Sequence, residues 1–121
     1  MCRKYDRFGK YIQENKYFIS QLNDIGIRKN YTGYYYLVDI LDILINQDLK
    51  VKSFSRQVYP IIAEKYNTSE CTVERNIRNL IDKSWSDKIR KKLIKVYDSP
   101  NKPHCRQFIY VIRNYIMMQI S

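Results

Sequence analysis

Arg75 and Arg78 lie three positions apart in a stretch whose apolar residues recur at helical spacing. Side chains three positions apart on a helix share one face, so both guanidinium groups can reach the same target. A guanidinium can donate two hydrogen bonds to N7 and O6 of a guanine in the major groove of DNA. The alternative is a surface pairing with Glu70, Glu74 or Asp82, an arrangement that contributes little to stability.

Glu74 directly precedes this pair, at a position where a carboxylate would stand close to a phosphate backbone. Its side chain could accept a hydrogen bond from a cytosine amino group, orient Arg75 or Arg78, or be a solvated charge. The sequence leaves these three interpretations open. Thr72 and Asn79 lie on the outer side of the same predicted helix and face solvent or DNA with it.

Hydroxyl and ammonium groups on either side of these residues suit the phosphate groups of a nucleic acid. Thr68 and Ser69 begin the predicted helix, where unpaired backbone amides and the helix dipole favour an anion, and helix capping is compatible with that contact. The next segment carries a run of lysines that can neutralise phosphates without reading sequence, or form a solvated charged face. These are Lys88, Lys91, Lys92 and Lys95.

The chain has few side chains that are suited to catalysis or metal binding. It contains one histidine, no glycine-rich phosphate loop, and no serine or cysteine placed beside a base and an orienting carboxylate. The cysteines, Cys2, Cys71 and Cys105, are widely spaced and are expected to be reduced thiols, even with His104 beside Cys105. We therefore expect that the protein is not an enzyme, has no catalytic residue, and binds no metal and no cofactor.

The charge of the chain points to a polyanionic partner. Its net charge is +10 and its sequence pI is about 9.6, values that favour a nucleic acid or an anionic membrane surface. Residues 1–49 hold seven basic and six acidic side chains, whereas residues 50–121 hold fifteen and six, so +9 of the +10 lies in the second part. That part contains the paired arginines.

Membrane spans and secretion signals are not expected in this sequence. No window approaches the roughly 20 apolar residues that a bilayer span requires. The charged start of the chain is followed by more charge rather than by an apolar signal-peptide core. The expectation is a soluble protein of the cytoplasm.

The elements that must position these side chains are predicted to be helices. Only three glycines and three prolines occur, and apolar residues recur every three or four positions, so we expect an all-α fold: one compact domain of about six helices. A basic arm over residues 1–16, either a solvated tail or a phosphate contact, precedes this domain at 17–121. The helices are predicted at 16–24, 32–46, 53–66, 69–85, 86–96 and 104–119. Pro60 is expected to bend the third helix, or to mark its effective beginning.

Residues 59–78 have the pattern of a helix-turn-helix, the layout of many DNA readers. Ala63 is small enough to let two helices approach closely, and Asn67 tolerates the left-handed backbone of a tight turn. Val73 and Ile77 anchor the second helix to the core. The same apolar face continues through Leu80, Ile81 and Trp85.

Apolar spacing also predicts the buried sides of the other helices. Ile89, Leu93 and Ile94 form the expected buried side of the helix at 86–96. The twelve tyrosines could stack on bases, but Tyr34 and Tyr36 extend the apolar stripe of the helix at 32–46, so packing explains the Tyr34-Tyr35-Tyr36 cluster better.

Short blocks distributed along the chain resemble one family, the C-terminal DNA-binding effector domain of stage-zero sporulation transcription factor A, a response regulator. The likeness covers roughly residues 17–120 and keeps its register through the helix-turn-helix. The blocks are Ile25-Gly26-Ile27, Gly33-Tyr34-Tyr35-Tyr36-Leu37, Val58-Tyr59-Pro60-Ile61-Ile62-Ala63, Tyr66-Asn67-Thr68, Val73-Glu74-Arg75-Asn76-Ile77-Arg78, Ser84-Trp85, and Lys102-Pro103 followed by Phe108-Ile109.

The resemblance implies a six-helix effector fold whose fourth helix enters the major groove. It also implies tandem binding of protomers on short DNA boxes and contact with the sigma subunit of RNA polymerase. Glu74, Arg75 and Arg78 match the family's signature and would inherit its DNA contacts, with Asn79 beside them. Thr72 stands where the family is expected to have an arginine, so the base preference at one position would differ.

The resemblance also implies a receiver domain that is not seen before the arm. The chain is then expected to be a stand-alone effector, or to be controlled by concentration, by a partner or by the arm. The leading hypothesis is a sequence-specific transcriptional regulator that binds double-stranded DNA through a recognition helix at about 69–85. The alternative is an interaction module with weak DNA affinity, which docks on sigma factor or on a full-length homologue.

Overall fold

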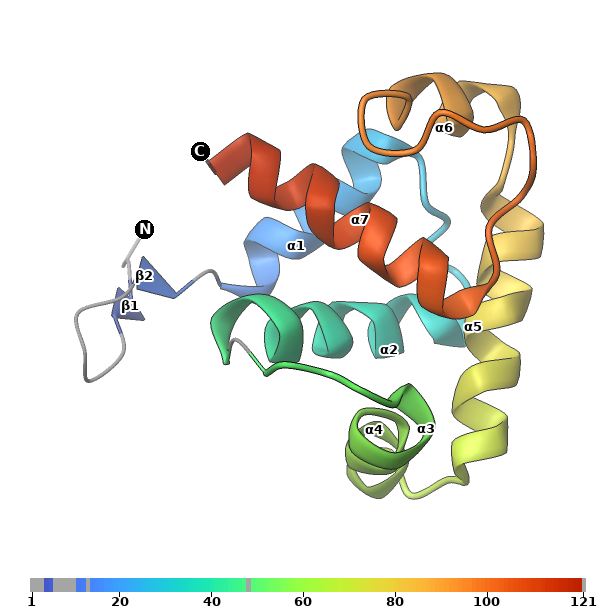
Figure 1. Ribbon diagram of the computed structural model, residues 1–121. Coiled ribbons are helices and arrows are strands. Elements are labelled where there is room, and N and C mark those ends of the chain that lie inside the picture. The colour runs from blue at the N-terminus through green and yellow to red at the C-terminus, as the bar shows by residue number, and fades with distance from the viewer. Residues whose placement is uncertain (1–3, 6–10, 13, 48, 121) are drawn as a thin grey trace.

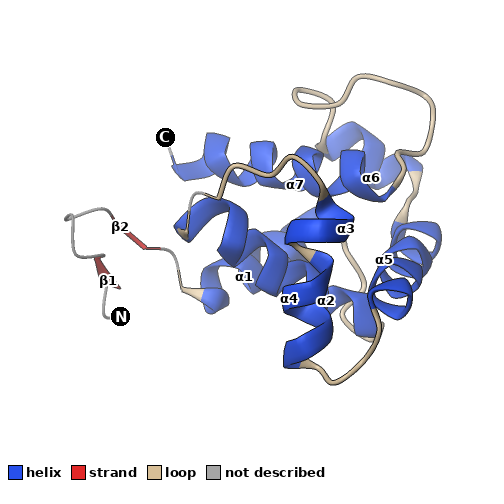
Figure 2. Cartoon of the chain, turned by 60° about the horizontal axis from the view of Figure 1, so that its bottom comes forward, coloured by secondary structure: helices blue, strands red, loops and turns tan. Residues whose placement is uncertain are grey.

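A computed structural model describes residues 4–5, 11–12, 14–47 and 49–120 of the chain. Helices are the main elements of this part, as the predicted all-α class requires (Figures 1 and 2). They are α1 (Asn15–Ile25), α2 (Thr32–Leu41), the π-helical turn η1 (Asp42–Asn46), α3 (Phe54–Gln57), α4 (Tyr59–Lys65), α5 (Glu70–Ser84), α6 (Asp87–Lys92) and α7 (Cys105–Ile120).

Two strands of two residues precede the helices. β1 (Lys4–Tyr5) pairs antiparallel with β2 (Tyr11–Ile12), and the pair lies at the end of the molecule opposite α5 (Figures 1 and 2). The rest of the predicted basic arm, apart from its last residues at the start of α1, lies outside the described residues. The strands themselves are an element that the sequence pattern did not predict.

The third predicted helix, at 53–66, is two helices in the structure. The chain breaks at Val58, whose backbone angles are φ −108° and ψ −55°, and Pro60 stands in the first turn of α4. A proline fits there because the first-turn amides have no intrahelical acceptor. The prediction that a helix begins effectively near Pro60 is therefore confirmed, and a continuous helix from 53 is wrong.

The predicted helix at 86–96 ends earlier than expected. α6 stops at Lys92 and is followed by turns, so Ile94 leaves the helical face and is 48% exposed. Its predicted burial is wrong, whereas Ile89 and Leu93 are buried as expected. Trp85 is half-buried just beyond the end of α5, where its ring meets that of Tyr97 edge to face at 6.0 Å between centroids.

α5 runs across one end of α2 and forms the edge of the molecule (Figure 1). The two helices touch backbone to backbone, because a Cβ atom on Gly33 would lie 2.3 Å from the carbonyl oxygen of Asn76. α4 and the first half of α7 complete the support of α5. Tyr34 and Tyr36 are buried, as predicted, whereas the predicted packing of Tyr35 is wrong, because its side chain is 51% exposed.

The apolar core joins residues from every α-helix. Its largest fully buried side chains include Phe18 of α1, Leu37 of α2, Ile62 of α4, Ile77 of α5 and Phe108 of α7. Within the described part of the chain, no helix has the length and apolar character needed to cross a membrane.

Candidate nucleic-acid interface

The helix-turn-helix is formed by α4, a short turn and α5. Asn67 has φ 53°, the left-handed conformation predicted for it, and the amide of Thr68 closes the turn on the carbonyl of Ala63 at 2.9 Å. Ala63 is buried, so its small side chain permits the close approach of the two helices. Ser69 then caps α5, because its Oγ accepts a hydrogen bond from the amide of Thr72 at 3.1 Å.

The buried face of α5 consists of the residues that the apolar spacing predicts. Val73, Ile77, Leu80 and Ile81 are all buried, with at most 1% of their surface exposed. Because successive residues turn by about 100° around a helix, Arg75 stands near the middle of the outer face. The other predicted base contacts divide between its flanks, Glu74 and Arg78 on one and Thr72 and Asn79 on the other.

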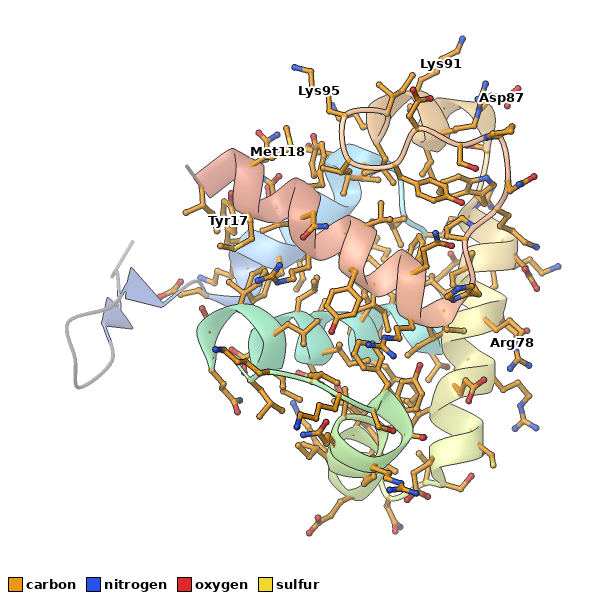
Figure 3. All side chains as sticks on the ribbon, viewed as in Figure 1. Tyr17, Arg78, Asp87, Lys91, Lys95 and Met118 are labelled. Carbon is orange, nitrogen blue, oxygen red and sulfur yellow. The ribbon has the colours of Figure 1, made fainter. Side chains whose placement is uncertain are left out.

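Glu74 and Arg78 form an ion pair on the first flank. A guanidinium nitrogen of Arg78 donates to a carboxylate oxygen of Glu74 at 2.8 Å, and both side chains keep about half of their surface in solvent, at 57% for Arg78 and 44% for Glu74. Arg78 projects from the side of α5 (Figure 3). The contact holds the guanidinium along the helix, so of the three roles considered for Glu74 it favours the orienting one.

Arg75 differs from Arg78 in having no such contact. Among the residues that the structure describes, it forms neither a hydrogen bond nor an ion pair, and it is exposed. Its guanidinium is therefore available to an external acceptor without the loss of an internal one.

On the opposite flank, Thr72 is already engaged within the helix start. Its Oγ1 lies 2.9 Å from Oγ of Ser69, and the side chain is partly buried. Thr68 is partly buried as well, whereas Ser69 and Asn79 are exposed. Two hydroxyl groups thus meet at the first turn of α5, where the helix dipole is positive.

The predicted phosphate-binding lysines lie on a different part of the surface. Figure 3 shows Lys91 and Lys95 at the α6 end of the molecule, pointing away from it, while Arg78 projects sideways from α5. Lys88 and Lys92 are exposed on α6, and Lys95 follows its end. The structure therefore does not bring these lysines together with the arginines of α5.

A groove that the sequence did not reveal adjoins the first flank of α5. It encloses about 710 Å³ between α3, α5 and the start of α7. Glu74, Arg78 and Asp82 form its α5 wall, and the other polar side chains of its walls include Lys52, Ser55, Lys102, His104 and Arg106. Lys102 reaches across to Asp82 in an ion pair, which links the loop before α7 to α5.

Cys105 and Tyr59 line the inner part of this groove. Burial raises the pKa of the Cys105 thiol, an effect that the nearby Arg78 opposes, and its Sγ points to the carbonyl oxygen of Glu74 at 3.8 Å. Burial also raises the pKa of the Tyr59 hydroxyl. Both groups are thus held in their neutral forms, which suits packing rather than nucleophilic chemistry. No cluster of three metal-ligating side chains occurs among the described residues.

A known protein family matches most of this chain. The family model described as "Sporulation initiation factor Spo0A C terminal" matches residues 18–116 of the 121. The matched segment starts within α1 and ends within α7, and it includes the helix-turn-helix and all of the groove walls.

Proposed function

The chain belongs to the family of the C-terminal domain of sporulation initiation factor Spo0A, and from this we propose that it binds specific double-stranded DNA sequences. In this proposal the protein regulates transcription, and α5 enters the major groove. The family is one of DNA-binding transcription factor domains and not of enzymes. The single observation that carries the finer proposal is the outer face of α5, where two arginines stand on a helix whose inner face is fully buried.

The two arginines receive different roles in this proposal. Arg75, unpaired among the described residues, donates to the base at the middle of the contact. Glu74 orients the guanidinium of Arg78 through the 2.8 Å ion pair. The guanidinium has further N–H donors beyond the one used in that pair, and these donate to a base. Asn79 and Thr72 contact bases on the opposite flank of α5. The side chain of Thr72 is short, and its hydroxyl is hydrogen-bonded to that of Ser69.

Phosphate contacts complete the proposed interface. Thr68 and Ser69 present hydroxyl groups beside the positive end of α5, where a backbone phosphate is favoured. The lysines at 88, 91, 92 and 95 contact phosphates only if the duplex extends past the C-terminal end of α5 toward α6. The DNA-binding domain is proposed to comprise residues 17–121, with residues 1–16 as an appended arm.

Selection of bound duplexes from a random pool, at about 150 mM salt, tests this function directly. Enrichment of a common sequence is expected. On that sequence, Arg75→Ala and Arg78→Ala should each weaken binding by about 1–3 kcal/mol while sparing binding to random duplex. An equal loss on selected and random duplex for every variant would show that the arginines do not read bases.

A second function is favoured by the α6 end of the molecule. Two apolar side chains are exposed here, Ile94 at 48%, between Lys92 and Lys95 in the sequence, and Met118 of α7 at 43%, and a protein partner would remove their apolar surface from water. A domain that docks through this surface on RNA polymerase sigma factor, or on another copy in tandem, would need only weak DNA affinity. Tight binding to sigma factor without enrichment of any duplex would favour this alternative.

A further inference from the structure

We infer that the groove between α3, α5 and the start of α7 is a second DNA-contacting surface, which holds two phosphates of one strand, one at Lys52 and one at Arg106, beside the base read by Arg78. The inference rests on the proposed function and extends it to residues outside the helix-turn-helix. Its occupant is one strand of the bound duplex.

The charge of the groove is the first argument. Four cationic side chains line it, Lys52, Arg78, Lys102 and Arg106, against two carboxylates, so the walls carry a net charge of +2 with His104 neutral. Internal ion pairs occupy both carboxylates, Glu74 with Arg78 and Asp82 with Lys102. An anion that enters the groove therefore meets carboxylates that are already neutralised.

Two cationic side chains of the groove remain available to bind that anion. Lys52 and Arg106 form no ion pair with any described residue. The guanidinium of Arg106 stands 5.8 Å from the ring centroids of both Phe54 and Tyr110, and Arg106 lines the groove. The Ser55 hydroxyl, 3.2 Å from that of Ser53, adds a neutral hydrogen-bonding group to the same wall.

The position of the groove beside α5 indicates that a DNA strand is the anion that occupies it. The polar residues of its α5 wall are Glu74, Arg78 and Asp82, which lie toward one flank of the proposed recognition helix. A helix in the major groove has a phosphate backbone along each side, because the groove is only about 12 Å wide. The strand on this side of α5 would pass the mouth of the groove, so its phosphates are the anions closest to Lys52 and Arg106.

Salt dependence of duplex binding measures such a contact. Each phosphate contact adds about 0.9 to the slope of log K against log salt, so Lys52→Ala and Arg106→Ala should each lower the slope by about 0.9. Between 50 and 200 mM salt, the affinity ratio of wild type to either variant should fall about 3.5-fold. Arg106→Lys, which keeps the charge, should retain the wild-type slope.

Arg113→Ala is the matched control, since Arg113 lies two turns further along α7 and outside the groove. It should leave the slope unchanged. Lys52→Ala removes no ring contact, so it tests the inference even if Arg106→Ala lowers stability by exposing Phe54. Wild-type slopes for both groove variants would overturn the inference.

The contacted phosphates can be located with duplexes that carry one neutral methylphosphonate. A substitution at the phosphate that Arg106 contacts should weaken wild-type binding and have no further effect on Arg106→Ala. Uniform effects on both proteins at every position would contradict the inference. Displacement of the duplex by inorganic phosphate at fixed ionic strength, lost in Arg106→Ala, would instead assign the groove to a free phosphate-bearing ligand.

The same measurements separate this inference from the function on which it rests. If wild type binds no duplex, both fall together. If a sequence is enriched and Arg78→Ala abolishes the preference, while Lys52→Ala and Arg106→Ala keep the wild-type slope, only the groove inference falls.

Discussion

The carbonyl oxygen of Asn76 lies 2.3 Å from the place that a Cβ atom would take on Gly33. This approach joins the first turn of α2 to the middle of α5, so it sets the depth at which α5 sits on the core. A methyl group there meets backbone rather than a movable side chain, and one of the two helices would have to shift.

Gly33→Ala is therefore expected to destabilise the domain by about 1–3 kcal/mol, although alanine favours a helix over glycine by about 1 kcal/mol. Urea unfolding followed by circular dichroism measures the change. Ser20→Ala, at an exposed position of α1, is the control and should leave the midpoint nearly unchanged. A Gly33→Ala protein as stable as wild type would contradict the close packing.

Ser69→Ala should cost about 1 kcal/mol of folding free energy, because the variant loses the cap on the amide of Thr72. Ser69→Asp separates capping from phosphate binding. Its carboxylate caps the helix and suits the helix dipole, so stability should return, while repulsion of a phosphate should weaken duplex binding. Recovery of both stability and affinity in Ser69→Asp would argue against a phosphate at this position.

Glu74→Gln tests whether the carboxylate orients Arg78. The ion pair is half-exposed, so the free energy of unfolding should change by no more than about 0.5 kcal/mol. Binding to random duplex should strengthen, since a negative charge is lost, but preference for the selected sequence should fall by about 1–3 kcal/mol. If affinity for both duplexes rises by the same factor, Glu74 is only a solvated charge.

Local sequence patterns predicted the helices and the helix-turn-helix because the determinants lie within a few residues of one another. The left-handed Asn67, the capping Ser69 and the apolar spacing of Val73 and Ile77 all act inside one turn or one helix. The burial of Ile94 was predicted wrongly because a helical wheel assumes that the helix continues, whereas α6 ends at Lys92.

The groove could not be predicted because contacts between distant residues build it. Lys102 pairs with Asp82 twenty positions away, and Cys105 meets the carbonyl of Glu74 across thirty-one. No spacing rule links such residues. The choice of Glu74 as the partner of Arg78 was among the sequence alternatives, and only the geometry of α5 distinguishes it from Asp82.

Alkaline unfolding provides a further test of the packing at the inner end of the groove, where burial raises the pKa of Tyr59 above its usual value of 10.0. Below that value the hydroxyl is protonated in both states, and its contribution to stability is fully present. As pH rises past 10, the unfolded chain ionises first and binds fewer protons than the folded one, so stability falls by up to about 1.4 kcal/mol per pH unit. Tyr59→Phe should reduce this slope, whereas Ile62→Val, a buried substitution without a titrating group, should lower stability equally at every pH. Equal slopes for Tyr59→Phe and wild type, measured by urea unfolding between pH 9 and 11, would show that the hydroxyl is not desolvated beside α5.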